Sequence, residues 1–202
     1  MNWDVLMECL DVQDVTGIRE LIFKDGQQRT NVHETAPDLP PDLPRRWSNP
    51  SGLTVLHLLA MMLPPSRLEH AVSRALQDLI LELVNDFGAD VNHTSKRTLG
   101  KTPLHCVCIG LLFINDDHVD WCLSIVNALL AAGAAVDPIT DDGLTPLAEA
   151  IGWRPVYRYM APRIACAKSL VRNGASLNRA KSALRSFPPW QKETLPPWVE
   201  EL

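Results

Sequence analysis

Long apolar runs are missing from this chain of 202 residues, although 46% of its residues are hydrophobic. None approaches the roughly 20 residues that a membrane-spanning helix needs, so we expect no transmembrane segment. The first ten residues hold two acids and no base, and therefore lack the basic region that opens a secretory signal peptide. These absences predict an intracellular protein, cytoplasmic or nuclear.

Cysteines are also few. The five that occur form an odd and unevenly spaced set, which indicates a reducing compartment rather than a disulfide framework. They are Cys9, Cys106, Cys108, Cys122 and Cys166. A chain of this length buries about 70% of its unfolded surface, so it can fold as one domain without disulfides or metal.

Acidic residues are missing from one long stretch. Residues 150–192 contain nine bases and no acid, whereas residues 1–149 contain 21 acids and 10 bases and the formal net charge is −5. The basic stretch suits an acidic protein surface, an anionic lipid or nucleic acid, and it also fits solvated charge or head-to-tail self-association. An overall pI of about 5.6 makes nucleic-acid binding the weaker of these interpretations.

Two short patterns alternate three times along the chain. The first is Gly-x-Thr-x-Leu. The second is an apolar pair, then within a few residues a glycine and a small residue, with an Asn or Asp three residues after the small residue. The first pattern begins at Gly52, Gly100 and Gly143, and the second has its glycine at Gly88, Gly133 and Gly174. A fainter copy occupies residues 18–33. Such internal repetition is typical of repeat architectures.

Each copy predicts one helix–turn–helix unit. The threonines of the first pattern are suitable helix N-caps, and Pro103 and Pro146 occupy the first helical position, where a missing N–H costs nothing. The glycines of the second pattern supply the left-handed residue that ends the second helix. The apolar face of such a unit can be covered only by another copy.

These motifs resemble the ankyrin repeat. Thr102–His105 matches its Thr-Pro-Leu-His opening in full and Gly88–Asn92 matches its close, while Val55 replaces the proline and Ala148 replaces the histidine. The resemblance implies an all-α ankyrin-repeat solenoid of about four repeats in a domain spanning residues 1–180. The approximate repeats are 1–35, 50–92, 99–138 and 142–178, with a proline-rich insertion at 36–50 and a C-terminal Pro/Trp strap at 181–202.

The repeats are longer than the family's 33 residues. The excess lies between the two helices of each unit, at Met61–His70, Leu111–Asp120 and Trp153–Pro162. Insertions at one position in consecutive repeats align on one edge of the stack, where they form either additional core or a wall along a binding groove. The proline-rich insertion reads as a long loop or a recognised peptide motif, and the strap as a cap or a partner-binding motif.

One constellation has spacing compatible with a metal. His105, Cys108, His118 and Cys122 offer zinc-ligand types, but the resemblance implies that His105 braces a loop, and the two cysteines occupy packing positions. We therefore assign no metal and no cofactor. An enzyme built on the scaffold, with a site near His105 and His118 that uses Cys106 or the paired aspartates, remains the alternative from another class.

The resemblance implies a non-catalytic protein-interaction module of the adaptor, inhibitor or effector type. A partner protein or peptide would bind the concave groove, the hairpin tips and the insertion wall, and we expect a monomer. Aromatic and arginine side chains are typical of interaction hot spots. The candidate contacts are Trp153, Arg154, Tyr157, Arg158 and Tyr159, with Asp116, Asp117, Asp141 and Asp142 on loops. The second alternative is an anionic ligand, nucleic acid or lipid, on the basic C-terminal quarter.

Overall fold

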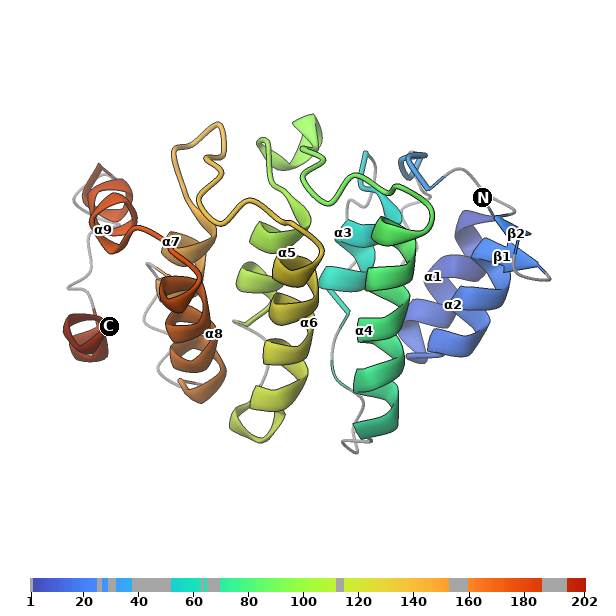
Figure 1. Cartoon of the computed structure of the whole chain (residues 1–202). Coiled ribbons are helices and arrows are strands. Elements are labelled where there is room, and N and C mark those ends of the chain that lie inside the picture. Colours follow the sequence, from blue (N-terminus) through green and yellow to red (C-terminus); the bar gives the residue numbers. More distant parts are fainter. Residues whose placement is uncertain are drawn as a thin grey trace.

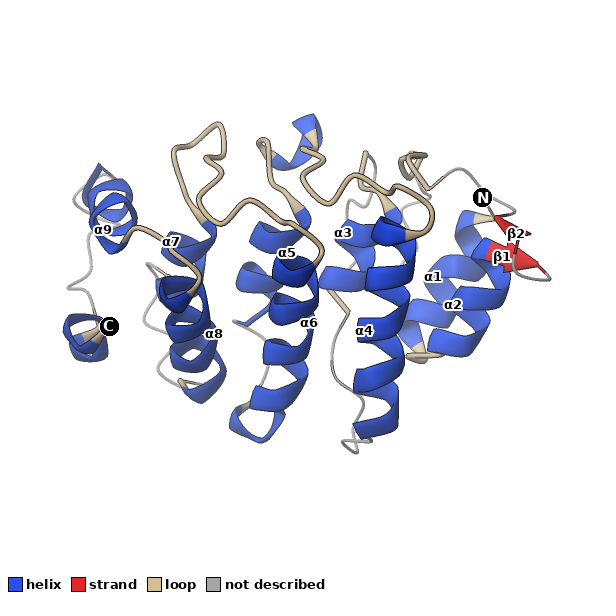
Figure 2. Ribbon diagram, viewed as in Figure 1, coloured by secondary structure: helices blue, strands red, loops and turns tan. Residues whose placement is uncertain are grey.

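The computed structural model describes residues 2–24, 27–28, 32–37, 52–62, 64, 70–111, 115–152, 160–186 and 196–202. These parts are all-α apart from one two-residue ladder, β1 (Phe23–Lys24) with β2 (Gln27–Gln28) (Figure 2). The α-helices are α1 (Trp3–Asp11), α2 (Val15–Ile22), α3 (Val55–Ala60), α4 (His70–Asn85), α5 (Pro103–Gly110), α6 (Val119–Ala131), α7 (Pro146–Ile151), α8 (Ala161–Arg172) and α9 (Leu177–Ser186). In the described ranges, no helix combines the length and apolarity that crossing a bilayer requires.

The first eight helices form four consecutive pairs, and each pair falls inside one of the four predicted repeat ranges. First helices contact first helices (α3 with α5, α5 with α7), and second helices contact second helices (α2 with α4, α4 with α6, α6 with α8). The chain therefore builds two parallel layers of helices. In Figure 1 the loop from α4 to α5 and the loop from α6 to α7 both lie along the top edge.

The predicted N-caps are confirmed at all three repeats. Thr54 and Thr102 begin α3 and α5 in capping boxes with the histidines three residues later, and the Thr145 hydroxyl accepts from Ala148 N at 3.2 Å. Each cap satisfies a backbone N–H that has no partner inside the helix. The first turn of each of these helices is thereby fixed by its own sequence.

Buried histidines connect one pair to the next. In α5, Nδ1 of His105 accepts from Thr102 N at 3.2 Å, and Nε2 lies 3.2 Å from the carbonyl of Leu144 in the following repeat. His57 repeats this arrangement with the carbonyl of Lys101, at 3.1 Å. Burial lowers the pKa of both imidazoles to about 4, so each is the neutral tautomer with its proton on Nε2. The ring then accepts within its own helix and donates to the next pair.

A second repeated contact involves the last residue of the closing motif. The Asn92 Oδ1 accepts from Ala135 N at 2.7 Å, and the Asp137 Oδ2 accepts from Ser176 N at 2.8 Å. Ala135 and Ser176 occupy the same position in consecutive motifs. Successive repeats are therefore joined by equivalent side-chain to backbone hydrogen bonds.

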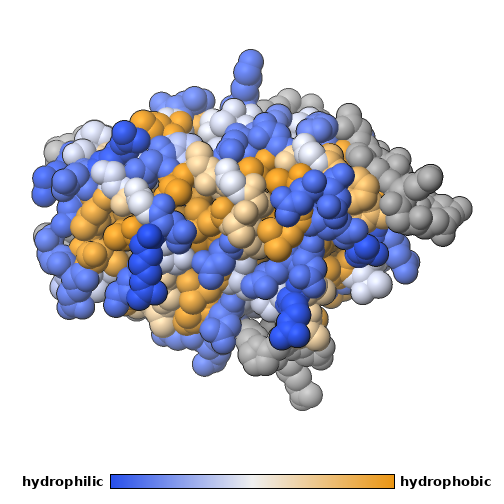
Figure 3. Space-filling model, in the orientation of Figure 1, coloured by the Kyte–Doolittle hydropathy of each residue, from blue (hydrophilic) through white to orange (hydrophobic). Residues whose placement is uncertain are grey.

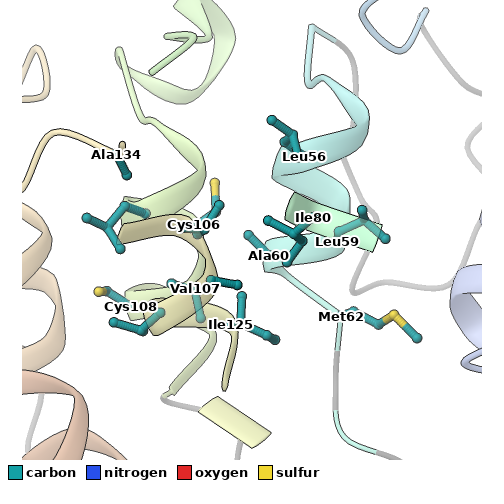
Figure 4. Packing of buried hydrophobic residues seen from close by; sticks show 14 of the residues in the cluster. Leu56, Leu59, Ala60, Met62, Ile80, Cys106, Val107, Cys108, Ile125 and Ala134 are labelled. Atoms are coloured by element: carbon teal, nitrogen blue, oxygen red, sulfur yellow. The ribbon is translucent and has the colours of Figure 1, made fainter. Parts of the chain in front are cut away.

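The core is continuous within and between the pairs. Figure 4 shows Leu56 and Ala60 on α3 facing Cys106 and Val107 on α5, and all four are at most 3% exposed. Small side chains at Ala60 and Cys106 let the two helices approach closely. The second layer adds polar connections, since Ser73 donates to Ser124 between α4 and α6 at 2.9 Å.

The inserted segments contribute to this core where they are described. Met62 and Leu111 are buried, and the buried indole of Trp121 donates from Nε1 to the Met62 carbonyl at 3.1 Å. This contact connects α6 to the connection of the preceding pair. Residues 63, 65–69, 112–114 and 153–159 of the predicted insertions lie outside the described residues, as does most of the proline-rich insertion.

The strap predicted for residues 181–202 begins as a helix, because α9 (Leu177–Ser186) continues to Ser186. Apolar residues recur there at helical spacing, and Ala180 and Leu184 are buried on the side facing α7. A 3-10 helix, η6 (Pro197–Glu201), follows, with Val199 fully buried and Trp198 packed against the core. This part of the tail covers the end of the stack, as a cap would, whereas Trp190 lies outside the described residues.

We predict that His105→Ala lowers the free energy of unfolding by about 2–4 kcal/mol, because the Leu144 carbonyl and the Thr102 groups lose their partner and a cavity remains. Urea titration followed by circular dichroism measures the change. His118→Ala is the matched control, since the ring Nδ1 of this half-buried histidine has no hydrogen-bond partner among the described residues. Equal losses in the two variants would contradict a linking role for His105.

Candidate functional site

The loops between pairs are closed by their own hydrogen bonds. In the loop between α4 and α5, Ser95 N donates to the Lys101 carbonyl at 3.2 Å, and the 3-10 helix η2 (Lys96–Thr98) forms the tip. In the next loop, the Thr140 hydroxyl accepts from Leu144 N at 2.9 Å and its backbone N–H donates to the Leu144 carbonyl at 3.0 Å. Both tips are therefore held in place without help from a partner.

Two apolar side chains project from these tips. Leu99 is 48% exposed and Ile139 is 57% exposed, and the backbone N–H of Asp141 donates to the Leu99 carbonyl at 2.8 Å. The two loops are thus in direct contact. Leu99 also has a φ of +58°, a left-handed conformation that costs an L-residue with a Cβ about 1–2 kcal/mol.

The predicted loop residues Asp141 and Asp142 lie at this surface and are exposed. The Asp141 carboxylate lies against Gly100, where a Cβ would be 3.0 Å from its Oδ1. Asp142 accepts from the Thr140 hydroxyl. We call Leu99, Ile139, Asp141 and Asp142 the loop-tip surface.

The other predicted pair, Asp116 and Asp117, is not part of this surface. Both lie in the 3-10 helix η4 (Asp116–His118) before α6, whereas Asp141 and Asp142 follow α6, whose 13 residues span about 20 Å. The Asp116 Oδ1 accepts from Ala161 N at 2.9 Å, at the start of α8. Asp116 therefore caps the second helix of the next pair, and its role as a partner contact stays a prediction.

The predicted aromatic and arginine contacts lie outside the described residues. They are Trp153, Arg154, Tyr157, Arg158 and Tyr159. Their neighbour Arg163 is described and is buried, with its Nε donating to the Ala150 carbonyl at 3.0 Å and a second N–H donating to the Ile151 carbonyl. These contacts place a cation at the C-terminal end of α7, where the helix dipole is negative.

The residues of the enzyme alternative are not brought together. His105 lies in the first turn of α5 and His118 lies beyond the other end of that helix. Burial raises the pKa of the Cys106 thiol to about 12, so the nucleophilic thiolate is scarce at neutral pH. No three His, Cys, Asp or Glu side chains within the described ranges are arranged to hold a metal ion.

A charged pair that the sequence reading missed lies between α5 and α7. The Glu149 carboxylate is 3.8 Å from Lys101 Nζ and is only 9% exposed. Burial raises its pKa to about 7, partly opposed by Lys101 and reinforced by Asp142. Equivalent positions in the other repeats hold Leu58 and Cys106, so an acid at this core position was the available signal.

The face of the molecule formed by the second helices is a mixture of polar and apolar surface. Figure 3 shows polar side chains that divide the apolar surface of this face into separate patches.

The chain matches no protein-family model and no curated protein. The loop-tip surface and the two ends of the stack are therefore the candidate sites of this chain.

We predict that Asp116→Ala lowers the free energy of unfolding by about 0.5–2 kcal/mol, the usual range for loss of a helix N-cap. Thermal and urea unfolding measure this loss. Asp117→Ala, an exposed neighbour on the same turn, is the control and should stay within about 0.5 kcal/mol of the parent. A larger loss for Asp117 would contradict the assignment of Asp116 as the cap.

We predict that Glu149→Gln becomes progressively more stable than the parent between pH 4.5 and 7. The parent binds a proton at Glu149 up to about pH 7 when folded but releases it near pH 4.5 when unfolded, so its stability falls as pH rises through this window. At about 1.4 kcal/mol for each unit of pKa shift, the difference should reach about 1–3 kcal/mol by pH 8.

Urea unfolding at a series of pH values measures this difference in the free energy of unfolding. The contribution of His57 and His105 titration cancels from the difference, because both proteins contain these histidines. Lys101→Met serves as the control, because loss of the cation should raise the pKa of Glu149 and extend the window above pH 7. A difference between Glu149→Gln and the parent that does not change with pH would contradict the prediction.

Proposed function

We propose that this chain is an ankyrin-type repeat protein that binds a partner protein or peptide and does not catalyse a reaction. The repeated contacts support this proposal. The histidine of one first helix reaches the next loop twice, from His57 to Lys101 and from His105 to Leu144. The closing motif reaches the next repeat twice, through Asn92 and Asp137. Equivalent positions make equivalent contacts, as a solenoid of similar units requires.

The observation that carries the function is the exposed pair Leu99 and Ile139. Neither side chain is needed to fill the core, since each is about half exposed, and Leu99 occupies its left-handed conformation at an energetic cost. Glycine or asparagine would fit that position better. An apolar residue at such a position is explained if a partner covers it.

The chemistry of the loop-tip surface indicates the kind of partner. Asp141 and Asp142 add two exposed carboxylates beside Leu99 and Ile139. Apolar anchors bordered by acidic groups suit a segment that presents apolar and basic side chains together. Because both loops are closed by internal hydrogen bonds, binding requires little ordering of this surface.

The five free cysteines fit the cytoplasmic or nuclear location that we infer.

We predict that Leu99→Asn/Ile139→Asn loses partner binding without losing stability. Asparagine tolerates the left-handed region, so the free energy of unfolding should stay equal or rise by up to about 1 kcal/mol. The immobilised 202-residue protein would be used to capture proteins from a cell lysate, with quantitative mass spectrometry of the bound fraction. Proteins enriched by the parent should be depleted at least about tenfold with the variant, equivalent to the loss of about 1.4 kcal/mol.

Val5→Asn/Val12→Asn is the matched control, because it makes the same exchange at the other two exposed large apolar residues of the described chain. It should capture the same proteins as the parent. A third variant, Trp153→Ala/Tyr157→Ala, tests the predicted aromatic contacts. An unchanged set of captured proteins in the Leu99/Ile139 variant would contradict a role for the loop tips.

A further inference from the structure

The first pair leaves one face of α1 exposed. Every residue of α3 and α7, which have a neighbour on each side, is buried. By contrast, α1 leaves Asp4, Val5 and Glu8 exposed, and Val12 just after it is 67% exposed. In Figure 1 this pair lies at one end of the row of helices, and α9 lies at the other end.

The open face of α1 is acidic and partly apolar. Asp4 and Glu8 are four residues apart and therefore neighbours on the helix surface, with Val5 beside them. Within α1 and α2 the only base is Arg19, and Arg19 is occupied by an ion pair with Glu82 at 2.7 Å. The negative charge of this end is therefore not neutralised by bases of its own helices.

The opposite end of the stack is basic. Helix α9 contacts α7 through its buried side and exposes Arg179, Ser182 and Arg185 on the other. Residues 160–186 contain no acid. Lys181 is paired with Glu200 at 3.0 Å. Arg179 Nη1 donates to the backbone carbonyl of Asp137 at 3.4 Å, and no carboxylate of the described residues forms an ion pair with Arg179 or Arg185.

We propose that the chain associates head to tail, with the acidic α1 face of one copy docking on the basic α9 face of another. The charges are complementary, and α1 of the second copy would take the place of a further first helix beyond α9. Arg179 and Arg185 are separated by about 9 Å along α9 and Asp4 and Glu8 by about 6 Å along α1. Each pair of charges therefore extends over one to two helical turns. Val5 and Val12 would be covered by the contact.

This contact joins two different surfaces, so both ends of a pair remain available for further copies. Because exposed ion pairs dominate it, the association is weak, depends on concentration and falls with salt. The expected monomer is then the dilute form. The inference does not depend on partner binding at the loop tips, which are formed by other residues.

The test is sedimentation velocity of the 202-residue protein over a series of concentrations, at about 50 and about 500 mM NaCl, between which the Debye length falls by roughly threefold. We expect the weight-average sedimentation coefficient to rise with concentration at low salt, and the association constant to fall at least about tenfold at high salt. A protein that stays monomeric at every concentration in low salt overturns the proposal.

Two charge-swap variants test the surfaces. Asp4→Lys/Glu8→Lys and Arg179→Glu/Arg185→Glu should each abolish self-association, whereas an equimolar mixture of the two should associate again, because each then offers the charge that the other needs. Asp78→Lys/Asp86→Lys, two exposed positions associated with α4, makes the same change in net charge as the first swap and should associate like the parent. Circular dichroism confirms that each variant is folded.

The remaining outcomes are equally decisive. Loss of association in the Asp78/Asp86 variant would assign the effect to net charge and overturn the proposal, as would failure of the mixture to associate. Binding of a heparin or DNA probe that depends on Arg179 and Arg185, without self-association, would assign the basic face to another anionic partner. The Leu99→Asn/Ile139→Asn variant should self-associate like the parent, which separates this test from that of the loop tips.

Discussion

One neutral imidazole tautomer, used twice, determines how the helix pairs of this protein are held together. His57 and His105 each accept a hydrogen bond from the threonine that caps their own helix and donate one to a carbonyl of the next pair. A protonated ring has no acceptor nitrogen, so the same contacts cannot be made by the charged form. Burial lowers the pKa of both rings and so favours the neutral form. The neutral form can be buried because both of its ring nitrogens have hydrogen-bond partners.

The last pair lacks this histidine, and the end of its first helix is held by a different contact. Ala148 stands at the equivalent position of α7, and the buried Arg163 caps the final carbonyls of that helix instead. Its guanidinium occupies the space beside Gly152, where any Cβ would collide with it. Helix α9 then covers α7 with small and apolar side chains and exposes arginines. The end of the stack is thus closed by packing and remains charged on its outer side.

The loop tips and the α1 end of the stack are the two places where the described chain exposes large apolar side chains. The loop tips combine them with backbone strain at Leu99, and the α1 end combines them with the exposed acids Asp4 and Glu8. Asp116, by contrast, uses its carboxylate within the fold, where it accepts a hydrogen bond from Ala161 N at the start of α8. An aspartate in a loop is therefore a binding candidate only if no helix terminus lies within its reach.

The sequence by itself determined the helix pairs, because caps, N1 prolines and left-handed glycines such as Gly88 act within a few residues of themselves. It also indicated which face of each pair needs a neighbour. Only the tertiary structure separated Asp116 from Asp141 and buried Arg163 and Glu149. It also brought the Leu99 carbonyl to the backbone N–H of Asp141 in the next loop. These features depend on residues about 10–60 positions apart meeting in space, and local periodicity carries no information about such distances.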